Sequence, residues 1–113
     1  MANTMVIFDG AGPLPQSATF NAPTDGSVTF VLSGTARTES AAVLIGINLS
    51  LDGNGIGNSA MCWANQNNNH QAMRTTFIPL ESLTFGEHTI EITNAYSDTI
   101  TDENDYFQVT MLY

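Results

Sequence analysis

The sequence predicts an all-β domain, a jelly-roll β-sandwich of about eight antiparallel strands. Apolar residues alternate with polar ones along several segments, and this period of two is typical of strands that place one face in a core. Turn-forming residues separate these segments at the spacing found in sandwiches and barrels. A helix is difficult to place, because the alanine-containing segment 38–44 is too short for a stable isolated helix.

The length of the chain sets the domain organisation. The 113 residues suit a single domain over 1–113 and are too few for two. A domain of this size can bury roughly 65% of the surface that its unfolded chain exposes. Apolar residues make up 42% of the sequence, which is ordinary for a folded protein and argues against disorder.

The clearest strand lies near the middle of the chain, at residues 43–51. Its odd positions are all valine, isoleucine or leucine, whereas the even positions after Leu44 are glycine, asparagine and serine. The sequence DGNG at 52–55 follows directly, and its residues tolerate the positive φ angles of tight hairpin turns. We therefore expect the chain to reverse direction at this point.

Five further segments show strand character: residues 5–8, 28–32, 73–78, 87–93 and 107–113. Three of them alternate clearly, and the segment at 28–32 follows a turn signal, PTDG. Pro79 is expected to close the segment at 73–78, because proline cannot donate to a ladder. One face of the predicted strands forms the expected core: Phe30, Val43, Ile45, Ile47, Leu49, Leu51, Ile90, Ile92, Phe107 and Val109.

The last third of the chain resembles a known architecture. The stretches PLESLTFGEHTIEI at 79–92 and SDTITDENDYFQVTMLY at 97–113 are similar to the closing half of jelly-roll domains of the tumour-necrosis-factor (TNF-like) and complement-C1q type. In those domains a strand of the pattern Leu-x-x-Gly-x-His-Thr-Ile precedes a final aromatic strand. The same rhythm is similar to that of carbohydrate-binding jelly rolls. The first resemblance implies a trimer that binds receptors, glycans or matrix, but no binding residue can be transferred because no binding motif matches.

The charge balance of this acidic protein excludes two classes of function. Eleven acidic residues stand against Arg37 and Arg74, for a net charge of −9. Nucleic-acid binding and attachment to an anionic membrane both require cations that the chain lacks. No apolar run approaches the ~18 residues of a membrane-spanning helix, and the N-terminus has no signal-peptide pattern. The negative charge either serves solubility or marks a site for cations or neutral, hydroxyl-rich ligands.

The strongest candidate binding site combines a tryptophan with the asparagine-rich loop that follows it. Its residues are Trp63, Asn65, Asn67, Asn68, Asn69 and His70. An aromatic face can stack on the apolar side of a sugar ring, and carboxamides both donate to and accept from sugar hydroxyls. The alternative, favoured because large aromatics are usually buried, places Trp63 in the core and makes the loop a simple turn.

Acidic residues near the C-terminus form a second candidate site. They are Asp98, Asp102, Glu103 and Asp105. Several oxygens along a loop suit calcium, and Asp52 and Asn54 would add two more if the fold brought them close. The favoured alternative is a solvated turn in which Asp and Asn side chains cap backbone groups. The sequence does not decide whether calcium binds near Asp102 and Asp105.

The remaining reactive side chains favour structural roles. His70 and His88 are 18 residues apart and form no local metal motif. His88 is in phase with Ile90 and Ile92, which predicts a core histidine with satisfied hydrogen bonds. Cys62 is the only cysteine, so no intrachain disulfide is possible, and we expect a buried, unreactive thiol.

These observations favour a non-catalytic, lectin-like module that binds a glycan or a cell-surface receptor without a cofactor. An enzyme is not expected, because no acid, base and nucleophile converge in the sequence. The alternative is a structural subunit of a surface or appendage assembly. Its motivation is the last strand, where Tyr106 and Leu112 lie on the phase opposite to Phe107 and would need a partner on a half-exposed edge. With the resemblance, this strand predicts a homotrimer.

Overall fold

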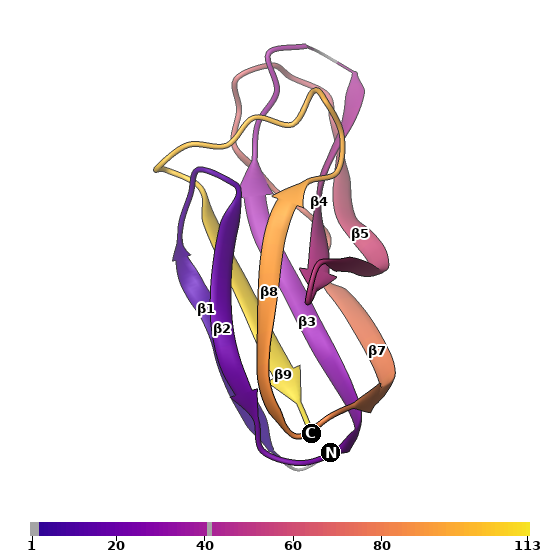
Figure 1. Ribbon diagram of the computed structural model, residues 1–113. Helices are drawn as coiled ribbons and strands as arrows, with labels where there is room; N and C mark the ends of the chain where they lie inside the picture. Colours follow the sequence, from indigo (N-terminus) through magenta and orange to yellow (C-terminus); the bar gives the residue numbers. More distant parts are fainter. Residues whose placement is uncertain (1–2, 41) are drawn as a thin grey trace.

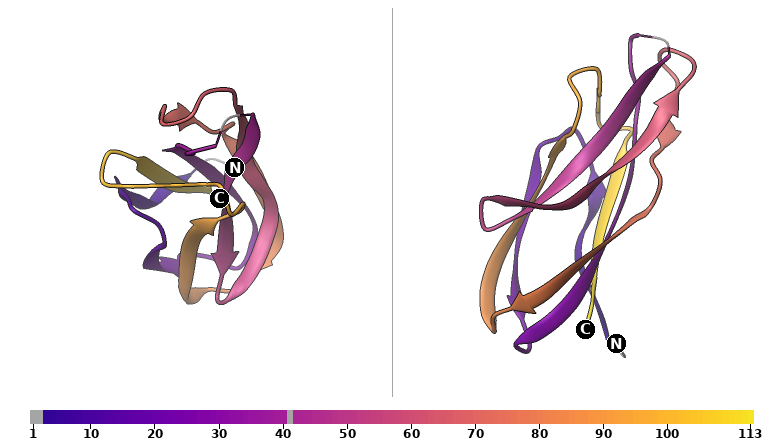
Figure 2. Two further views of the ribbon diagram at one scale, coloured as in Figure 1. Left: turned by 90° about the horizontal axis from the view of Figure 1, so that it is seen from above. Right: turned by 90° about the vertical axis from the view of Figure 1, so that its right-hand side faces the viewer.

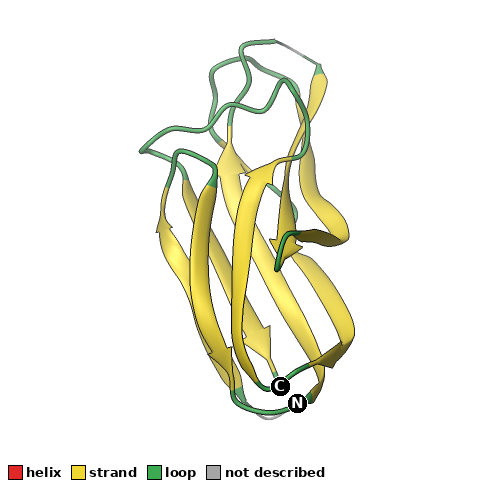
Figure 3. Ribbon diagram, in the orientation of Figure 1, coloured by secondary structure: helices red, strands yellow, loops and turns green. Residues whose placement is uncertain are grey.

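The computed structural model describes residues 3–40 and 42–113. That part of the chain contains strands and no helix, and thus no helix that could span a membrane (Figure 3). The strands are β1 (Thr4–Ala11), β2 (Gln16–Ala22), β3 (Gly26–Ala36), β4 (Val43–Leu51), β5 (Asn54–Ala64), β6 (Gln71–Ala72), β7 (Thr76–Leu83), β8 (Gly86–Asn94) and β9 (Tyr106–Leu112) (Figure 1). The all-β prediction is confirmed, with eight long strands and the two-residue β6.

The strands form two antiparallel sheets that pack face to face (Figure 2). One sheet has the order β1-β9-β3-β7, with β6 also pairing with β3, and the other has the order β2-β8-β4-β5. The pairing is nested: β1 pairs with β9, β2 with β8, β3 with β7 and β4 with β5. The chain therefore forms one long hairpin whose turn lies between β4 and β5. The two arms of this hairpin wind together into two sheets, which is the jelly-roll topology.

The turn at the midpoint of this roll has the predicted geometry. Asp52 and Gly53 both have positive φ angles, 51° and 87°, as a two-residue hairpin of this type requires. Leu51 and Asn54 pair on either side of the turn. The Asp52 amide also donates to the Thr89 carbonyl oxygen at 2.8 Å, so the turn is tied to β8.

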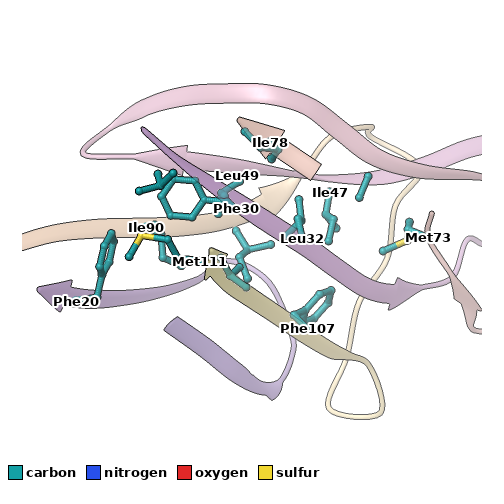
Figure 4. Close-up of a cluster of buried hydrophobic side chains, with 14 of the residues drawn as sticks. Phe20, Phe30, Leu32, Ile47, Leu49, Met73, Ile78, Ile90, Phe107 and Met111 are labelled. Atoms are coloured by element: carbon teal, nitrogen blue, oxygen red, sulfur yellow. The ribbon is translucent and has the colours of Figure 1, made fainter. Parts of the chain in front are cut away.

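The core lies between the two sheets and follows the predicted alternation (Figure 4). Eight residues of the expected set are buried: Phe30, Ile45, Ile47, Leu49, Ile90, Ile92, Phe107 and Val109. Val43 and Leu51, at the two ends of β4, are only partly buried. The expected core therefore extends one residue too far at each end of that strand.

Two expectations about strands are wrong. Pro79 does not close a strand, because β7 runs through it to Leu83. β7 pairs only with β3, so it is an edge strand, where a missing amide hydrogen is tolerated. The last strand, β9, is not an edge: it lies between β1 and β3 and pairs with both. Tyr106 and Leu112 consequently belong to the outer face of a sheet, not to an open edge.

Candidate functional site

The outer face of the four-stranded sheet has an apolar end on β4 and β5. Trp63 pairs with Leu44, and their exposed fractions are 53% and 39%. The next outward-facing pair, two positions further along the strands, is Met61 and Gly46. The Tyr96 hydroxyl donates to the Met61 sulfur at 3.7 Å. A Cβ at position 46 would lie 3.2 Å from the Tyr96 ring and 2.8 Å from a β5 carbonyl oxygen. Glycine at this position therefore lets the tyrosine ring lie against the sheet.

The exposure of Trp63 corrects the expectation that it is a core residue. β5 is the edge strand of its sheet, and its side chains alternate between the core and solvent. Its inward positions are Ala60, Cys62 and Ala64, with both alanines buried. Burial raises the pKa of the partly buried Cys62 thiol, which agrees with the expected unreactive cysteine.

The same face continues into a polar end formed by β4 and β8. Asn48 pairs with Thr93, and Ser50 pairs with Glu91. The Asn48 Oδ1 atom accepts a hydrogen bond from the Ser59 hydroxyl, which leaves the carboxamide nitrogen free of that bond. A hollow of about 530 Å³ lies here, lined by Asn48, Leu49, Ser50, Gly53, Gly55, Ile56, Gly57, Glu91 and Thr93. The face thus offers stacking groups at one end and hydrogen-bonding groups at the other.

A second hollow lies beside the first along the outer edge of β5. Its volume is about 470 Å³, and its lining residues are Gly57, Asn58, Ser59, Met61, Arg74 and Thr76. Gly57 is common to both hollows. Its φ angle is +63°, and a Cβ there would collide with the side chain of the buried Ile78, so this position requires glycine.

The asparagine-rich loop between β5 and β6 is shaped by its own contacts. Asn68 has a φ angle of 62°, its amide donates to the Thr38 carbonyl oxygen at 2.6 Å, and its Oδ1 accepts from Arg37 Nη1 at 3.0 Å. The Asn69 side chain donates to Gln66 Oε1. These contacts shape the loop, and ligand binding by Asn68 and Asn69 stays a prediction. Asn65 and Asn67 are exposed and close to Trp63 in sequence.

His70 lies in a polar cluster that includes Asp102 and Asp105. The Asp105 side chain is fully buried, and its Oδ1 accepts from Thr35 Oγ1 at 2.8 Å and lies 2.7 Å from His70 Nδ1. Its Oδ2 accepts from the Asp102 amide at 2.9 Å. The ligand atoms of the histidine and the two aspartates lie within 4.8 Å of one another, which a metal ion could bridge. Arg37 Nε, however, is 3.5 Å from Asp102 Oδ2 and already supplies positive charge there.

These contacts favour a structural role for the acidic loop. Asp102 Oδ1 accepts from the Asn104 amide at 2.8 Å, which is the predicted capping of backbone groups. Asp98 and Glu103 are exposed and outside the cluster of His70, Asp102 and Asp105. The cluster joins the start of β9 to β3 and to the asparagine-rich loop, so it fixes the loops at that end of the sandwich.

Asp52 lies elsewhere and pairs with the second histidine. Its Oδ2 is 2.6 Å from His88 Nδ1, and the Thr84 carbonyl oxygen is 2.7 Å from His88 Nε2. The hydrogen bond with Asp52 raises the pKa of His88, and that with His88 lowers the pKa of Asp52. The structure therefore brings neither Asp52 to the acidic loop nor His88 to His70. His88 is the hydrogen-bonded histidine that the sequence predicts, with a side chain 11% exposed.

Nested pairing and two packed sheets, one of five strands and one of four, define the protein as a jelly-roll β-sandwich, and comparison with solved structures agrees. The C-terminal domain of EclA, a sugar-binding protein, is similar with a TM-score of 0.50 and 18% identity, over 98% of this chain and 79% of that chain. The CBM36-1 domain of a multidomain xylanase from the hindgut metagenome of Trinervitermes trinervoides gives 0.51 and 11%, over 96% of both chains. Dimeric latent PorU from Porphyromonas gingivalis gives 0.52 and 13%, over 96% of this chain but only 11% of that one.

These likenesses establish the fold and leave the ligand to be argued from the site. No protein-family model matches the chain, and comparison with curated proteins finds no match. The jelly-roll part of the sequence resemblance is confirmed. Its more specific part, the likeness to the tumour-necrosis-factor and C1q type, stays a prediction.

Proposed function

We propose that this protein is a non-catalytic carbohydrate-binding module whose ligand stacks on Trp63. The observation that carries the proposal is the 53% exposure of this indole on a paired strand. A sugar ring has an apolar face that can cover such a surface. Because backbone pairing already holds the strand, little conformational freedom is lost on binding. Two similar structures, a sugar-binding protein and a carbohydrate-binding module of a xylanase, support this class of ligand.

The asparagine-rich loop supplies the polar part of the proposed site. Asn65 and Asn67 are exposed and follow Trp63 by two and four residues in the sequence. Their carboxamides can both donate to and accept from sugar hydroxyls. Asn68, Asn69 and His70 hold the shape of the loop through the contacts described above. The ligand is a glycan, free or carried by a cell-surface receptor.

A glycan array followed by two matched variants tests this function. Trp63→Ala removes the stacking surface, and we expect its affinity for the bound glycan to fall at least about tenfold, or roughly 1.4 kcal/mol. Phe85→Ala is the control, because Phe85 is an aromatic residue with 70% exposure in the turn between β7 and β8, and its affinity should be unchanged. Absence of any glycan ligand, or equal binding by Trp63→Ala and the unaltered protein, would overturn the proposal.

A second candidate function, a structural subunit, is favoured by the outer face of the five-stranded sheet. Val6, Thr110, Val31 and Phe77 pair in one row across β1, β9, β3 and β7. Val6 and Phe77 are 57% and 63% exposed, and the row contains no charge. Two chains of net charge −9 repel one another least where uncharged surfaces meet. We propose that this face joins copies of the chain, with the homotrimer as the expected state.

Light scattering decides between the single chain and the trimer. Leu112 lies on this face in the next row, between Thr4 of β1 and Thr29 of β3. Leu112→Asp places a charge in the proposed contact, so we expect the mass to fall from that of three chains to that of one. A single-chain mass for the unaltered protein at micromolar concentration, or a trimer that survives the substitution, would refute this assembly.

A further inference from the structure

We propose that the ligand is a linear, uncharged oligosaccharide that extends from Trp63 along β4 into the polar hollow of Asn48, Ser50, Glu91 and Thr93. This inference rests on the proposed carbohydrate-binding function and adds a second binding region to it. The hollow lies outside the residues that the sequence singles out, and its chemistry differs from that of the tryptophan end. Both regions lie on the outer face of the four-stranded sheet.

The length of the outer face between its two ends fits an oligosaccharide and not a single sugar ring. The Leu44–Trp63 pair marks one end of the face, and the Ser50–Glu91 pair marks the other. Ser50 lies six positions after Leu44 along β4, and at about 3.3 Å per position this is about 20 Å. All even positions between them face outward with these two, because the strand alternates. An oligosaccharide bound over this length contacts several successive rows.

The path between the two ends runs over the Tyr96 ring, because Gly46 beneath it is buried. Gly46 has no side chain, and Tyr96 lies against it, so an aromatic surface continues the one begun by Trp63. Beyond it, the hairpin between β4 and β5 contributes Gly53, Gly55 and Gly57 to the lining of the hollow. These residues have no side chains to wall off the hydroxyl and carboxamide groups of β4 and β8.

The lining of the hollow suits hydroxyl groups. The Thr93 hydroxyl can donate and accept, and the Asn48 carboxamide nitrogen can donate. The Ser50 hydroxyl, which donates to the Glu91 carbonyl oxygen at 3.4 Å, can accept, as the Glu91 carboxylate does. A hydroxyl that donates to a carboxylate makes a charge-assisted hydrogen bond, which is stronger than a neutral one. A polyhydroxylated ligand can therefore use each of these groups.

Charge restricts the ligand further. Glu91 is the charged residue of this hollow, and no lysine or arginine lines it. The chain as a whole has a net charge of −9. Uronate or sulfate groups over this hollow would face Glu91 and would be repelled, because Arg74 lines the second hollow and not this one. Neutral sugars carry no such penalty, so the site selects an uncharged chain over an acidic one.

Trp63 is the only tryptophan, so its fluorescence can follow binding directly. The probes are cello-, xylo-, manno- and laminari-oligosaccharides of two to six units, with oligogalacturonates as the acidic series. We expect affinity for a neutral series to rise at least about tenfold from two to six units, as hydrogen bonds in the hollow are added. We expect no binding of the acidic series, whose charge has the same sign as that of Glu91.

Two variants test the hollow itself. Glu91→Gln and Thr93→Val should each weaken binding of the six-unit ligand about fivefold, the effect of one lost hydrogen bond, and leave the two-unit ligand unchanged. The glutamine and valine introduced are both compatible with a β-strand. Circular dichroism should show that each variant is folded before it is titrated. Glu87→Gln is the matched control, because it makes the same change on β8 four residues away, and it should bind as the unaltered protein does.

The outcomes separate this inference from the function on which it rests. Equal affinity for two and six units, or unaltered six-unit binding by both Glu91→Gln and Thr93→Val, would overturn the extended site even if Trp63→Ala abolishes binding. Tighter binding of the acidic series would overturn the selection of uncharged over acidic chains. If no series binds, the carbohydrate-binding function and the extended site both fall.

Discussion

The pair formed by Asp52 and His88 predicts a specific dependence of stability on pH. The two His88 ring nitrogens face the Asp52 carboxylate at 2.6 Å and the Thr84 carbonyl oxygen at 2.7 Å. Both oxygens only accept hydrogen bonds, so this environment favours the protonated imidazole, which donates from both ring nitrogens. The hydrogen bond with Asp52, followed by that with Thr84, raises the pKa of His88 above its ordinary value of 6.5.

The direction of each pKa change gives the pH range of the effect. Because the folded-state pKa of His88 is raised, its stabilisation is fully present below pH 6.5 and is lost as the pH rises through the folded-state pKa. Hydrogen bonds from His88 and Thr89 lower the pKa of Asp52 below 3.8, so its stabilisation is present above pH 3.8 and is lost as the pH falls through the lowered pKa. The pair therefore stabilises the fold most between pH 3.8 and 6.5.

Asp52→Asn is the perturbation that isolates the pair. Asparagine tolerates the φ angle of 51° at this position, and its oxygen can still accept from the Thr89 amide at 2.9 Å. The change therefore removes mainly the charge on the partner of His88. A charge-assisted hydrogen bond contributes about 1.5–3 kcal/mol. The Asp52 side chain is 46% exposed, so solvent screening reduces the expected loss to about 1 kcal/mol.

Urea denaturation of the unaltered protein and the variant at several pH values measures this loss. We expect the difference in free energy of unfolding to be largest near pH 5.5 and to shrink as the pH rises above the raised pKa of His88. Glu87→Gln, which removes one exposed negative charge from the neighbouring position on β8, controls for the change in net charge. A difference that stays constant from pH 5 to pH 9, or no difference at pH 5.5, would refute the reasoning.

Three further substitutions test the core, the polar cluster and the aromatic end of the site. Ile47→Ala, at a fully buried position of β4, should cost about 2–5 kcal/mol in urea denaturation, and a loss under ~1 kcal/mol would contradict the β4 register. Asp105→Asn replaces a carboxylate that accepts hydrogen bonds with a carboxamide, whose NH₂ group would face the groups that donate to Asp105. The free energy of unfolding should fall by about 3 kcal/mol, and unchanged stability would show that the cluster does not hold the loops. Gly46→Ala should displace Tyr96 and cost about 1–3 kcal/mol, and a crystal structure with the ring unmoved would disprove the proposed packing.

The predictable part of the fold is the part with strong local patterns. β4 combines strict alternation with a turn sequence, and both its inward face and its hairpin are as predicted. β2 and β5 carry weaker patterns: much of β5 is glycine, asparagine and serine, and its buried inward residues are alanines. The sequence consequently indicates how many strands to expect more clearly than where each one lies.

Which strands become neighbours depends on tertiary pairing that no local pattern contains. The apolar content of β9 suggested a partner on an open edge, whereas nested pairing places it between β1 and β3. The same pairing brings Asp105 to His70 over 35 residues and sets Glu91 beside Ser50. The polar cluster and the polar hollow could therefore not be found from sequence spacing. Trp63 was found, but its exposure follows from the edge position of β5.

The fluorescence of Trp63 during titration with neutral oligosaccharides tests the central claim most directly. Trp63 is the only tryptophan, and its indole is 53% exposed on the proposed binding face. Stacking of a sugar ring removes water from the indole, so we predict a saturable change in its emission. Affinity electrophoresis of the same samples reports binding independently of the tryptophan. Two results would contradict the account. In one, a polysaccharide retards the protein but its oligosaccharides leave the Trp63 emission unchanged; in the other, no polysaccharide retards the protein.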